Sequence, residues 1–295
     1  MMPAAHAHQP VMPSEVLAAL AVRAHHWYVD GTFGAGGHTR AILDAGGRVL
    51  AIDRDPQVAR HRPSHQDATR FRLVQGDFRH LDRVVAGAGI APVAGVLLDL
   101  GISSMQLDEP ERGFAFRQEG PLDMRMGAAG ETAADVVNDS SFEELAGIIY
   151  RYGEERHSRR IARAVVRARE QAPIETTGQL ADIIAAAFPP GRRREHPARR
   201  TFQALRIHVN DELGALEEAL EAAERVLEPG GRLVVISYHS LEDRIVKRAF
   251  RDRPALEPIY KKPLRPTEEE SAGNPRSRSA KLRAAELREP QGGAT

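Results

Sequence analysis

Cysteine is absent from this sequence of 295 residues, which excludes a disulfide framework and metal sites built from thiolates. No apolar run approaches the roughly 20 residues that a membrane-spanning helix needs, so we expect no membrane partner. The first residues lack the basic start and apolar core of an export signal, and we expect a cytoplasmic protein. Lys and Arg together number 41, as do Asp and Glu, so affinity for nucleic acid must come from a local basic patch.

Two motifs of well-known hydrolases are also missing. A Ser-His-Asp hydrolase of the α/β type carries Gly-x-Ser-x-Gly around its nucleophile, and no such string occurs. The string His-Glu-x-x-His, with which a helix holds zinc, does not occur either, so we expect no metal. An enzyme in this chain must therefore work by other chemistry.

Short apolar or β-branched runs alternate with stretches of helical length through the first third of the chain. Each run is closed by a turn or an acidic residue, which is typical of a buried strand. Strands are predicted at Trp27–Asp30, Val49–Asp53, Phe71–Val74, Val93–Asp99 and Arg232–Ser237. Such alternation predicts an α/β fold, in which a largely parallel sheet is covered by helices on both faces.

A different pattern separates the fourth and fifth predicted strands. Charged helical segments occur there at Ser141–Tyr152, Arg156–Glu170 and Thr177–Phe188, and they predict an inserted all-helical domain. We therefore expect the sheet domain at 1–109 and 209–295, and the insertion at 110–208. Near the end of the chain, residues 258–261 and 279–282 predict a closing hairpin around a mobile loop.

The glycine-rich stretch Asp30–His38 leaves the first strand and enters a helix. Glycines in such a turn let the backbone approach a bound ligand closely, although a tight structural bend needs them as well. Asp53, at the end of the next strand, is placed to accept hydrogen bonds from ribose hydroxyls, as in sites for NAD or S-adenosylmethionine. Asp30 favours S-adenosylmethionine, because an acid at this place repels the pyrophosphate of a dinucleotide.

Further polar residues follow the other strands. Asp99 closes the fourth strand and is the leading candidate for chemistry, since ligands of open α/β sheets gather at the carboxyl ends of strands. Its alternative role is to cap the following turn. Asp77 is either a partner for an adenine amino group or an ordinary surface residue. His239, after the fifth strand, is either a general base or a structural group.

The strongest local cluster of positive charge lies inside the predicted insertion. It comprises Arg192, Arg193, Arg194, Arg199 and Arg200, with His196 and Phe202 nearby. These arginines either bind RNA phosphates or form a solvated helix face. In the C-terminal tail, Arg276 and Arg278 either add to the same surface or are disordered.

Many strings of this sequence, in order along nearly the whole chain, resemble one family. The family is the MraW (RsmH) group of 16S rRNA cytosine-N4 methyltransferases. The strings that carry the resemblance are His8–Val11, Asp30–His38, Ala51–Asp55, Leu97–Ser104, Gln106–Asp108, Glu111–Phe114, Gly120–Met126, Tyr152–Arg156, Arg200–Ile207, Val209–Asn210, Ser240–Arg244 and Asn274–Arg276. The chain departs from the family at Met12-Pro13, where a leucine pair is usual, which concerns only the N-terminal path.

The resemblance implies a class I (Rossmann-like) methyltransferase sheet with a helical insertion that recognises RNA. It implies S-adenosyl-L-methionine as cofactor and 16S rRNA of the small ribosomal subunit as partner, with a cytidine of the decoding region methylated at N4. The cofactor contacts that it implies are Gly36, Gly37, His38, Asp53, Phe78, Asp99 and Gln106. It leaves the oligomeric state open.

Many amino-group methyltransferases carry Asn/Asp-Pro-Pro-Tyr, and here Asp99-Leu100-Gly101-Ile102 stands in its place, so the catalytic arrangement of those enzymes cannot be transferred to this chain. Asp99 is the hypothetical catalytic residue because of its place at the end of the fourth strand. Three other functions remain as alternatives. They are a methyltransferase with another substrate, a cofactor-binding RNA chaperone without turnover, and an NAD-dependent dehydrogenase.

Overall fold

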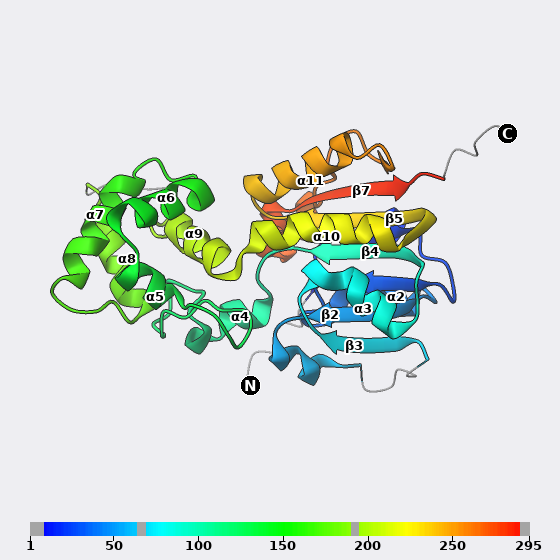
Figure 1. Cartoon of the computed structure of the whole chain (residues 1–295), viewed down its shortest axis with the longest axis horizontal. Coiled ribbons are helices and arrows are strands. Elements are labelled where there is room, and N and C mark those ends of the chain that lie inside the picture. The colour runs from blue at the N-terminus through cyan, green and yellow to red at the C-terminus, as the bar shows by residue number, and fades with distance from the viewer. Residues whose placement is uncertain (1–8, 64–68, 190–194, 290–295) are drawn as a thin grey trace. The chain divides into compact units, whose positions relative to one another are not determined.

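The computed structural model describes residues 9–63, 69–189 and 195–289. The chain forms two compact units: residues 1–101 with 213–295 make a sheet unit, and residues 102–212 make a helical unit (Figure 1). The sequence alone predicts these boundaries after residues 109 and 208. The first lies earlier because Ile102 already packs against the helical core, and the second lies later because helix α9 (Arg199–Asn210) belongs wholly to the helical unit.

The described residues of the sheet unit build a seven-stranded sheet with the strand order β3-β2-β1-β4-β5-β7-β6. The strands are β1 Trp27–Asp30, β2 Arg48–Asp53, β3 Phe71–Gln75, β4 Val93–Asp99, β5 Leu227–Ser237, β6 Leu256–Pro258 and β7 Lys281–Leu287. Strands β1 to β5 pair in parallel, and β7 is antiparallel to both of its neighbours. The predicted α/β fold with a largely parallel sheet is therefore confirmed.

Helices cover both faces of this sheet. On one face, Val96 and Leu98 of β4 share a buried cluster with Val85 of α3 (Leu81–Ala88), Leu220 of α10 (Glu212–Val226) and Val246 of α11 (Ser240–Asp252). The other face is covered by α1 (Pro13–Leu20) and α2 (Gly37–Asp44). Because successive strand residues point to opposite faces, near-continuous apolar strands are what a doubly covered sheet requires.

The helical unit has its own buried core. Its helices are α4 Ser104–Asp108, α5 Ala133–Asp139, α6 Phe142–Gly153, α7 Ser158–Arg169, α8 Thr177–Ala186 and α9. Helix α6 begins one residue later than predicted because Ser141 is its cap: the Ser141 hydroxyl accepts from the Glu144 N–H at 3.2 Å, and Glu144 accepts from the Ser141 N–H at 2.9 Å. A reciprocal cap of this kind satisfies two backbone donors at the helix start.

The C-terminal segment corrects one expectation. The predicted pairing of 258–261 with 279–282 is replaced by a pairing of β6 with β7, in which Pro258 lies opposite Ala285. The intervening residues, predicted to be a mobile loop, include helix α12 (Glu268–Gly273). The side chain of Thr267 caps this helix, and Glu270 accepts a hydrogen bond from the Met12 N–H at 2.7 Å.

Among the described residues, no helix is long and apolar enough to span a membrane.

Asn210 ties together two distant strings of the helical unit. Its side-chain Oδ1 accepts from the Met126 N–H at 2.9 Å, and its Nδ2 donates to the Met124 carbonyl at 2.7 Å. Met124 has a φ of 62°, in the left-handed region that a long side chain rarely adopts. The Asn210 side chain therefore satisfies a backbone N–H and a backbone carbonyl of this strained turn, which a helix or strand would otherwise satisfy.

Asn210→Ala should lower the free energy of unfolding by about 2–5 kcal/mol, because it leaves a buried N–H and a buried carbonyl without partners. Urea titration followed by circular dichroism measures this change. Asn210→Asp keeps the acceptor but turns a carboxylate oxygen toward the carbonyls of Met124 and Arg206, so it should be destabilised at least as much. The exposed substitution Gln171→Ala is the control and should change stability by less than about 0.5 kcal/mol. Equal stability of Asn210→Ala and the control would contradict this role.

Candidate cofactor and catalytic site

The turn after β1 is hydrogen-bonded to both neighbouring strands. The Gly31 N–H donates to the carbonyl of Leu97 in β4 at 2.9 Å, and the Phe33 N–H donates to the carbonyl of Ile52 in β2 at 3.1 Å. The turn thus stands at the carboxyl edge of β2, β1 and β4. The crevice at this edge is where open α/β sheets bind their ligands.

Two of the glycines in this turn are required by close contacts. Gly36 has a φ of 73°, in the left-handed region, and a Cβ there would lie 2.8 Å from the Phe33 ring. A Cβ on Gly37 would lie 2.9 Å from the ring of Pro10. The N-terminal string that ends at Val11 therefore packs directly on the turn. Side chains of Phe33 and Pro10 thus fill the space that a Cβ on either glycine would need, so both positions require glycine.

Asp30 has a structural place within this turn. Its carboxylate is 1% exposed, accepts from the Thr39 hydroxyl at 2.6 Å and accepts from the Thr32 N–H at 3.2 Å. Burial raises its pKa, against the hydrogen bond from Thr39 and the charge of His38. The negative charge of Asp30 disfavours a pyrophosphate at this turn. The structure shows that its contacts also hold the turn in shape.

Asp53 ends β2 with both carboxylate oxygens directed at backbone N–H groups. Oδ2 accepts from Gly34 at 2.8 Å and Oδ1 accepts from Asp55 at 2.9 Å. Burial raises the pKa of Asp53 to about 6, although both backbone hydrogen bonds act to lower it. Each oxygen keeps a second lone pair, so this carboxylate fits the predicted contact to a pair of ribose hydroxyls.

Asp99 ends β4 and is held from three sides. Its backbone N–H donates to the Thr32 hydroxyl at 2.7 Å, which ties it to the glycine turn. The Tyr238 hydroxyl donates to its Oδ1 at 2.7 Å, and His38 Nε2 lies 3.4 Å from its Oδ2. Its side chain remains 22% exposed, so it can still accept a hydrogen bond from a ligand. The predicted residues His38 and Asp99 are thus brought together.

The two partners of Asp99 have shifted acidities that suit an ionised carboxylate. Burial lowers the pKa of His38, but the hydrogen-bonding and charge interactions with Asp99 outweigh it, and the net pKa is raised. The imidazolium form is thereby favoured next to the carboxylate. Burial and the charge of Asp99 raise the pKa of Tyr238 well above its ordinary value, so its hydroxyl remains a donor.

Sequence reasoning missed Tyr238 and considered its neighbour His239 instead. His239 is the cap of α11: its Nδ1 accepts from the Glu242 N–H at 3.5 Å, and its Nε2 lies 3.2 Å from a carboxylate oxygen of Glu242. Glu242 also accepts from the Tyr238 N–H at 2.8 Å. The structural alternative for His239 is therefore the one observed. The only available signal for Tyr238 was its place directly after β5.

Other predicted residues lie in different settings. Phe78 flanks the turn, because its Cβ lies 3.3 Å from the place of a Cβ on Gly31. Asp77 forms ion pairs with Arg54 at 3.6 Å and Arg79 at 3.5 Å, which gives it a role without a ligand. Gln106 belongs to the helical unit, where it caps α4 by accepting from the Ser103 N–H at 3.1 Å.

The predicted RNA-binding arginines are described only in part. Arg192, Arg193 and Arg194 lie outside the described residues. Arg199 pairs with Glu195, and Arg200 donates to the carbonyl of Glu154 at 3.0 Å. Both are exposed in the first turn of α9.

Comparison with known proteins gives the family. A family model described as the MraW methylase family matches residues 5–288. The chain belongs to the MraW methylase family. Relatives named ribosomal RNA small subunit methyltransferase H are 56% identical in Deinococcus deserti, over 95% of this chain and 93% of theirs, and 54% identical in Deinococcus radiodurans, over 96% and 91%. A solved rRNA methylase from Streptococcus thermophilus aligns with 97% of this chain and 100% of its own, at 13% identity and a TM-score of 0.46, which is too weak to bear on function.

Membership of the MraW family confirms S-adenosylmethionine as the cofactor and identifies the chain as a methyltransferase. The residues at the carboxyl edge of the sheet fit S-adenosylmethionine. The turn offers backbone without side chains at Gly36 and Gly37, and Asp53 offers free lone pairs. The Nδ1 atom of His38 is buried without a hydrogen-bond partner among the described residues, as expected of a polar atom that faces a ligand.

The pKa of Asp53 predicts a pH-dependent affinity for the cofactor. Ribose hydroxyls donate to the ionised carboxylate, so the affinity for S-adenosylhomocysteine should rise as the pH increases through about 6. Binding at pH 5 should be about tenfold weaker than at pH 7. Calorimetry over this range measures the effect.

Asp53→Asn is the matched control for this measurement, because it keeps the shape of the side chain and removes its titration. Contributions from His38 and Asp30 are common to both proteins, so the difference between the two pH profiles reports Asp53 alone. Parallel profiles would show that Asp53 does not contact the cofactor.

Proposed function

We propose that this chain methylates ribosomal RNA of the small subunit, at the exocyclic N4 of a cytidine in the decoding region of 16S rRNA. The observation that carries the proposal is the identity of more than half of its residues, over nearly its whole length, with relatives named for small-subunit rRNA methylation. The proposal includes a cytoplasmic location, since its substrate is made there. It also includes RNA binding by Arg192, Arg193, Arg194, Arg199 and Arg200 of the helical unit, which has the role of RNA recognition.

Asp99 is proposed to accept a hydrogen from the amine that becomes methylated. The amine of cytosine is a poor nucleophile because its lone pair is delocalised into the ring. When bound, S-adenosylmethionine supplies a sulfonium methyl that is already a good electrophile. A carboxylate that accepts the amine hydrogen favours the positive charge that develops on nitrogen as the new bond forms, and it can take up the released proton.

The contacts of Asp99 support this role. Tyr238 and His38 each occupy one side of one carboxylate oxygen, which fixes the plane of the group without filling all of its lone pairs. A fixed acceptor lowers the barrier because no reorientation is needed during the reaction. Gln106 and Phe78 remain proposed cofactor contacts beside Gly36, Gly37, His38 and Asp53.

The direct test is a map of modified nucleosides in small-subunit rRNA from cells that lack the gene. N4-methylcytidine should be missing at one position and should return when the wild-type gene is restored. Mass spectrometry of nuclease fragments gives both the nucleoside and its position. Loss of methylation on another nucleoside, or on a protein, would contradict the proposed substrate.

Asp99→Asn in the same cells tests the proposed acceptor. It should fail to restore the modified nucleoside, with turnover in vitro reduced by about a thousandfold or more, while the affinity for S-adenosylhomocysteine changes little. Asp82→Asn is the matched control, because Asp82 pairs with Arg225 on the surface, and it should restore methylation fully. Turnover by Asp99→Asn near the wild-type rate would sink the assignment.

A further inference from the structure

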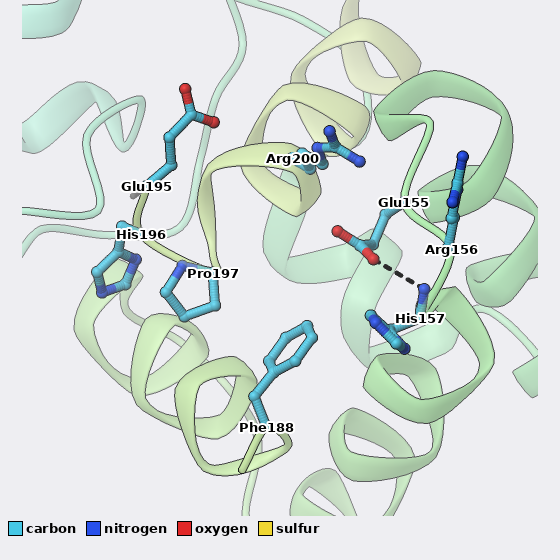
Figure 2. A pocket seen from close by; sticks show the side chains of 8 residues that line it. All are labelled: Glu155, Arg156, His157, Phe188, Glu195, His196, Pro197 and Arg200. Atoms are coloured by element: carbon cyan, nitrogen blue, oxygen red, sulfur yellow. Dashed lines mark hydrogen bonds between the residues drawn. The ribbon is translucent and has the colours of Figure 1, made fainter. Parts of the chain in front are cut away.

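A pocket opens in the helical unit beside the starts of two helices. Residues before α7, residues before α9 and in its first turn, and one aromatic side chain that follows α8 line it. The lining residues are Glu155, Arg156, His157, Phe188, Glu195, His196, Pro197 and Arg200. Figure 2 shows the Phe188 ring pointing into the space between Pro197 and His157, with Glu155 and Arg200 across from it.

The charge around this pocket suits an anion. Arg156 and Arg200 are exposed, and neither forms an ion pair with any residue that the structure describes. Arg200 donates one N–H to the Glu154 carbonyl at 3.0 Å, which holds the guanidinium in place without neutralising it. The carboxylate of Glu195 is already paired with Arg199. Glu155, the other acid of the lining, directs one oxygen at the His157 N–H and forms no ion pair with either arginine among the described residues. Two arginines that lack acidic partners are well suited to bind a phosphate.

The helix starts add to this positive potential. Helices α7 and α9 each have 12 residues, and the side chain of neither N-cap residue caps the first turn. The N–H groups of the two N-cap residues are bonded, that of His157 to Glu155 and that of Ala198 to His196 Nδ1 at 3.2 Å. The first N–H groups of a helix point along its axis toward the cap and favour negative charge there. The helix ends thus reinforce the two arginines.

Phe188 and Glu155 give the pocket features that a bare phosphate does not require. His157 contacts the Phe188 ring edge-on, with centroids 5.4 Å apart and an angle of 89° between the planes. Glu155 is 8% exposed, and its Oε1 accepts from the His157 N–H at 2.7 Å (Figure 2). Its other oxygen has no hydrogen-bond partner within the described parts of the chain. An aromatic ring stacks with a nucleobase, and a carboxylate accepts only from a donor such as an exocyclic amine.

We propose that this pocket binds one nucleotide of single-stranded RNA whose base carries an exocyclic amine. Arg156 and Arg200 hold its phosphate, Phe188 stacks on its base, and Glu155 accepts from the amine. Cytosine, adenine and guanine have such an amine and uracil does not. The inference rests on the proposed function, because it takes rRNA as the substrate, and it adds a specific contact outside the arginines that the sequence singled out.

Fluorescence anisotropy of the full chain with labelled oligocytidine and oligouridine tests the base contact. The wild-type protein should bind oligocytidine about tenfold more tightly. Glu155→Gln keeps an acceptor for the His157 N–H and removes the charge, so it should bind the two oligonucleotides equally. A preference that persists in Glu155→Gln, or that is absent from the wild-type protein, would overturn the base contact.

The salt dependence of the same binding tests the phosphate contact. The double variant Arg156→Gln, Arg200→Gln should lower the slope of log affinity against log salt by about 0.7, the value for one phosphate of a single strand. Arg167→Gln, at the far end of α7, is the matched control and should leave the slope unchanged. If Arg167→Gln has an equal effect, RNA binds the basic face of α7 in general and the pocket is overturned.

Phe188→Leu tests the stacking contact, since leucine keeps apolar volume and removes the aromatic face. It should bind oligocytidine about tenfold more weakly at an unchanged salt slope. A melting temperature near that of the wild-type protein shows that the variant is folded. Wild-type affinity in a folded variant would overturn this contact.

A polyglutamate peptide that competes with RNA in the wild-type protein and not in the arginine double variant would assign the pocket to acidic protein instead.

Failure of this inference is separable from failure of the proposed function. If the wild-type protein methylates small-subunit rRNA but the pocket variants keep its oligonucleotide affinity, only the pocket is wrong. If the wild-type protein methylates no small-subunit rRNA while the pocket variants lose oligonucleotide binding, the pocket stands and the proposed substrate is wrong.

Discussion

The position of the Asp99 carboxylate is the constraint on which the site depends. Its backbone is paired within the sheet and bonded to the Thr32 hydroxyl, while its side chain is held by Tyr238 and His38. These partners come from the turn after β1, the start of α2 and the residue after β5. Parallel strands bring such distant segments to one edge, so a single carboxylate there links the glycine turn to the last parallel strand.

The glycine turn and Asp53 lie at the same carboxyl edge of the sheet, at the ends of β1 and β2. The turn is bonded to β2 and β4, and Asp53 accepts from Gly34 within it. The pKa of Asp53 is raised because burial destabilises its ionised form more than the two backbone hydrogen bonds stabilise it. A ligand that donates hydroxyl hydrogens offsets this cost, because it stabilises the ionised form.

The parts of the fold with strong local signals were predictable from sequence. Strands β1 and β4 match their predicted bounds, because apolar runs that end in an acid leave little choice of register. Strand β5 begins at Leu227, five residues before the prediction, since its first residues read as a turn and yet Leu227 pairs with Val93. The helix α12 was missed because its stability comes from a cap and from Met12, far away in the sequence.

The candidate site was predictable for residues at strand ends and in the turn, but their roles were not. Asp30 and His239 are polar residues at the predicted edge, and their contacts with Thr39 and Glu242 give them structural roles. Tyr238 carries no motif, and only its 2.7 Å contact with Asp99 reveals it. The net charge of zero gives no indication of the arginines around the pocket. The local electrostatic potential depends on which charges are paired in the folded chain, and the net charge does not show this.

A crystal structure with S-adenosylhomocysteine tests the central claim most directly, namely that Asp99 and the glycine turn share one cofactor site. The account predicts both ribose hydroxyls within about 2.6–3.2 Å of the Asp53 carboxylate and the cofactor sulfur facing Asp99. A ligand bound away from the carboxyl edge of β1 and β4, or one whose sulfur is separated from Asp99 by other side chains, would contradict it.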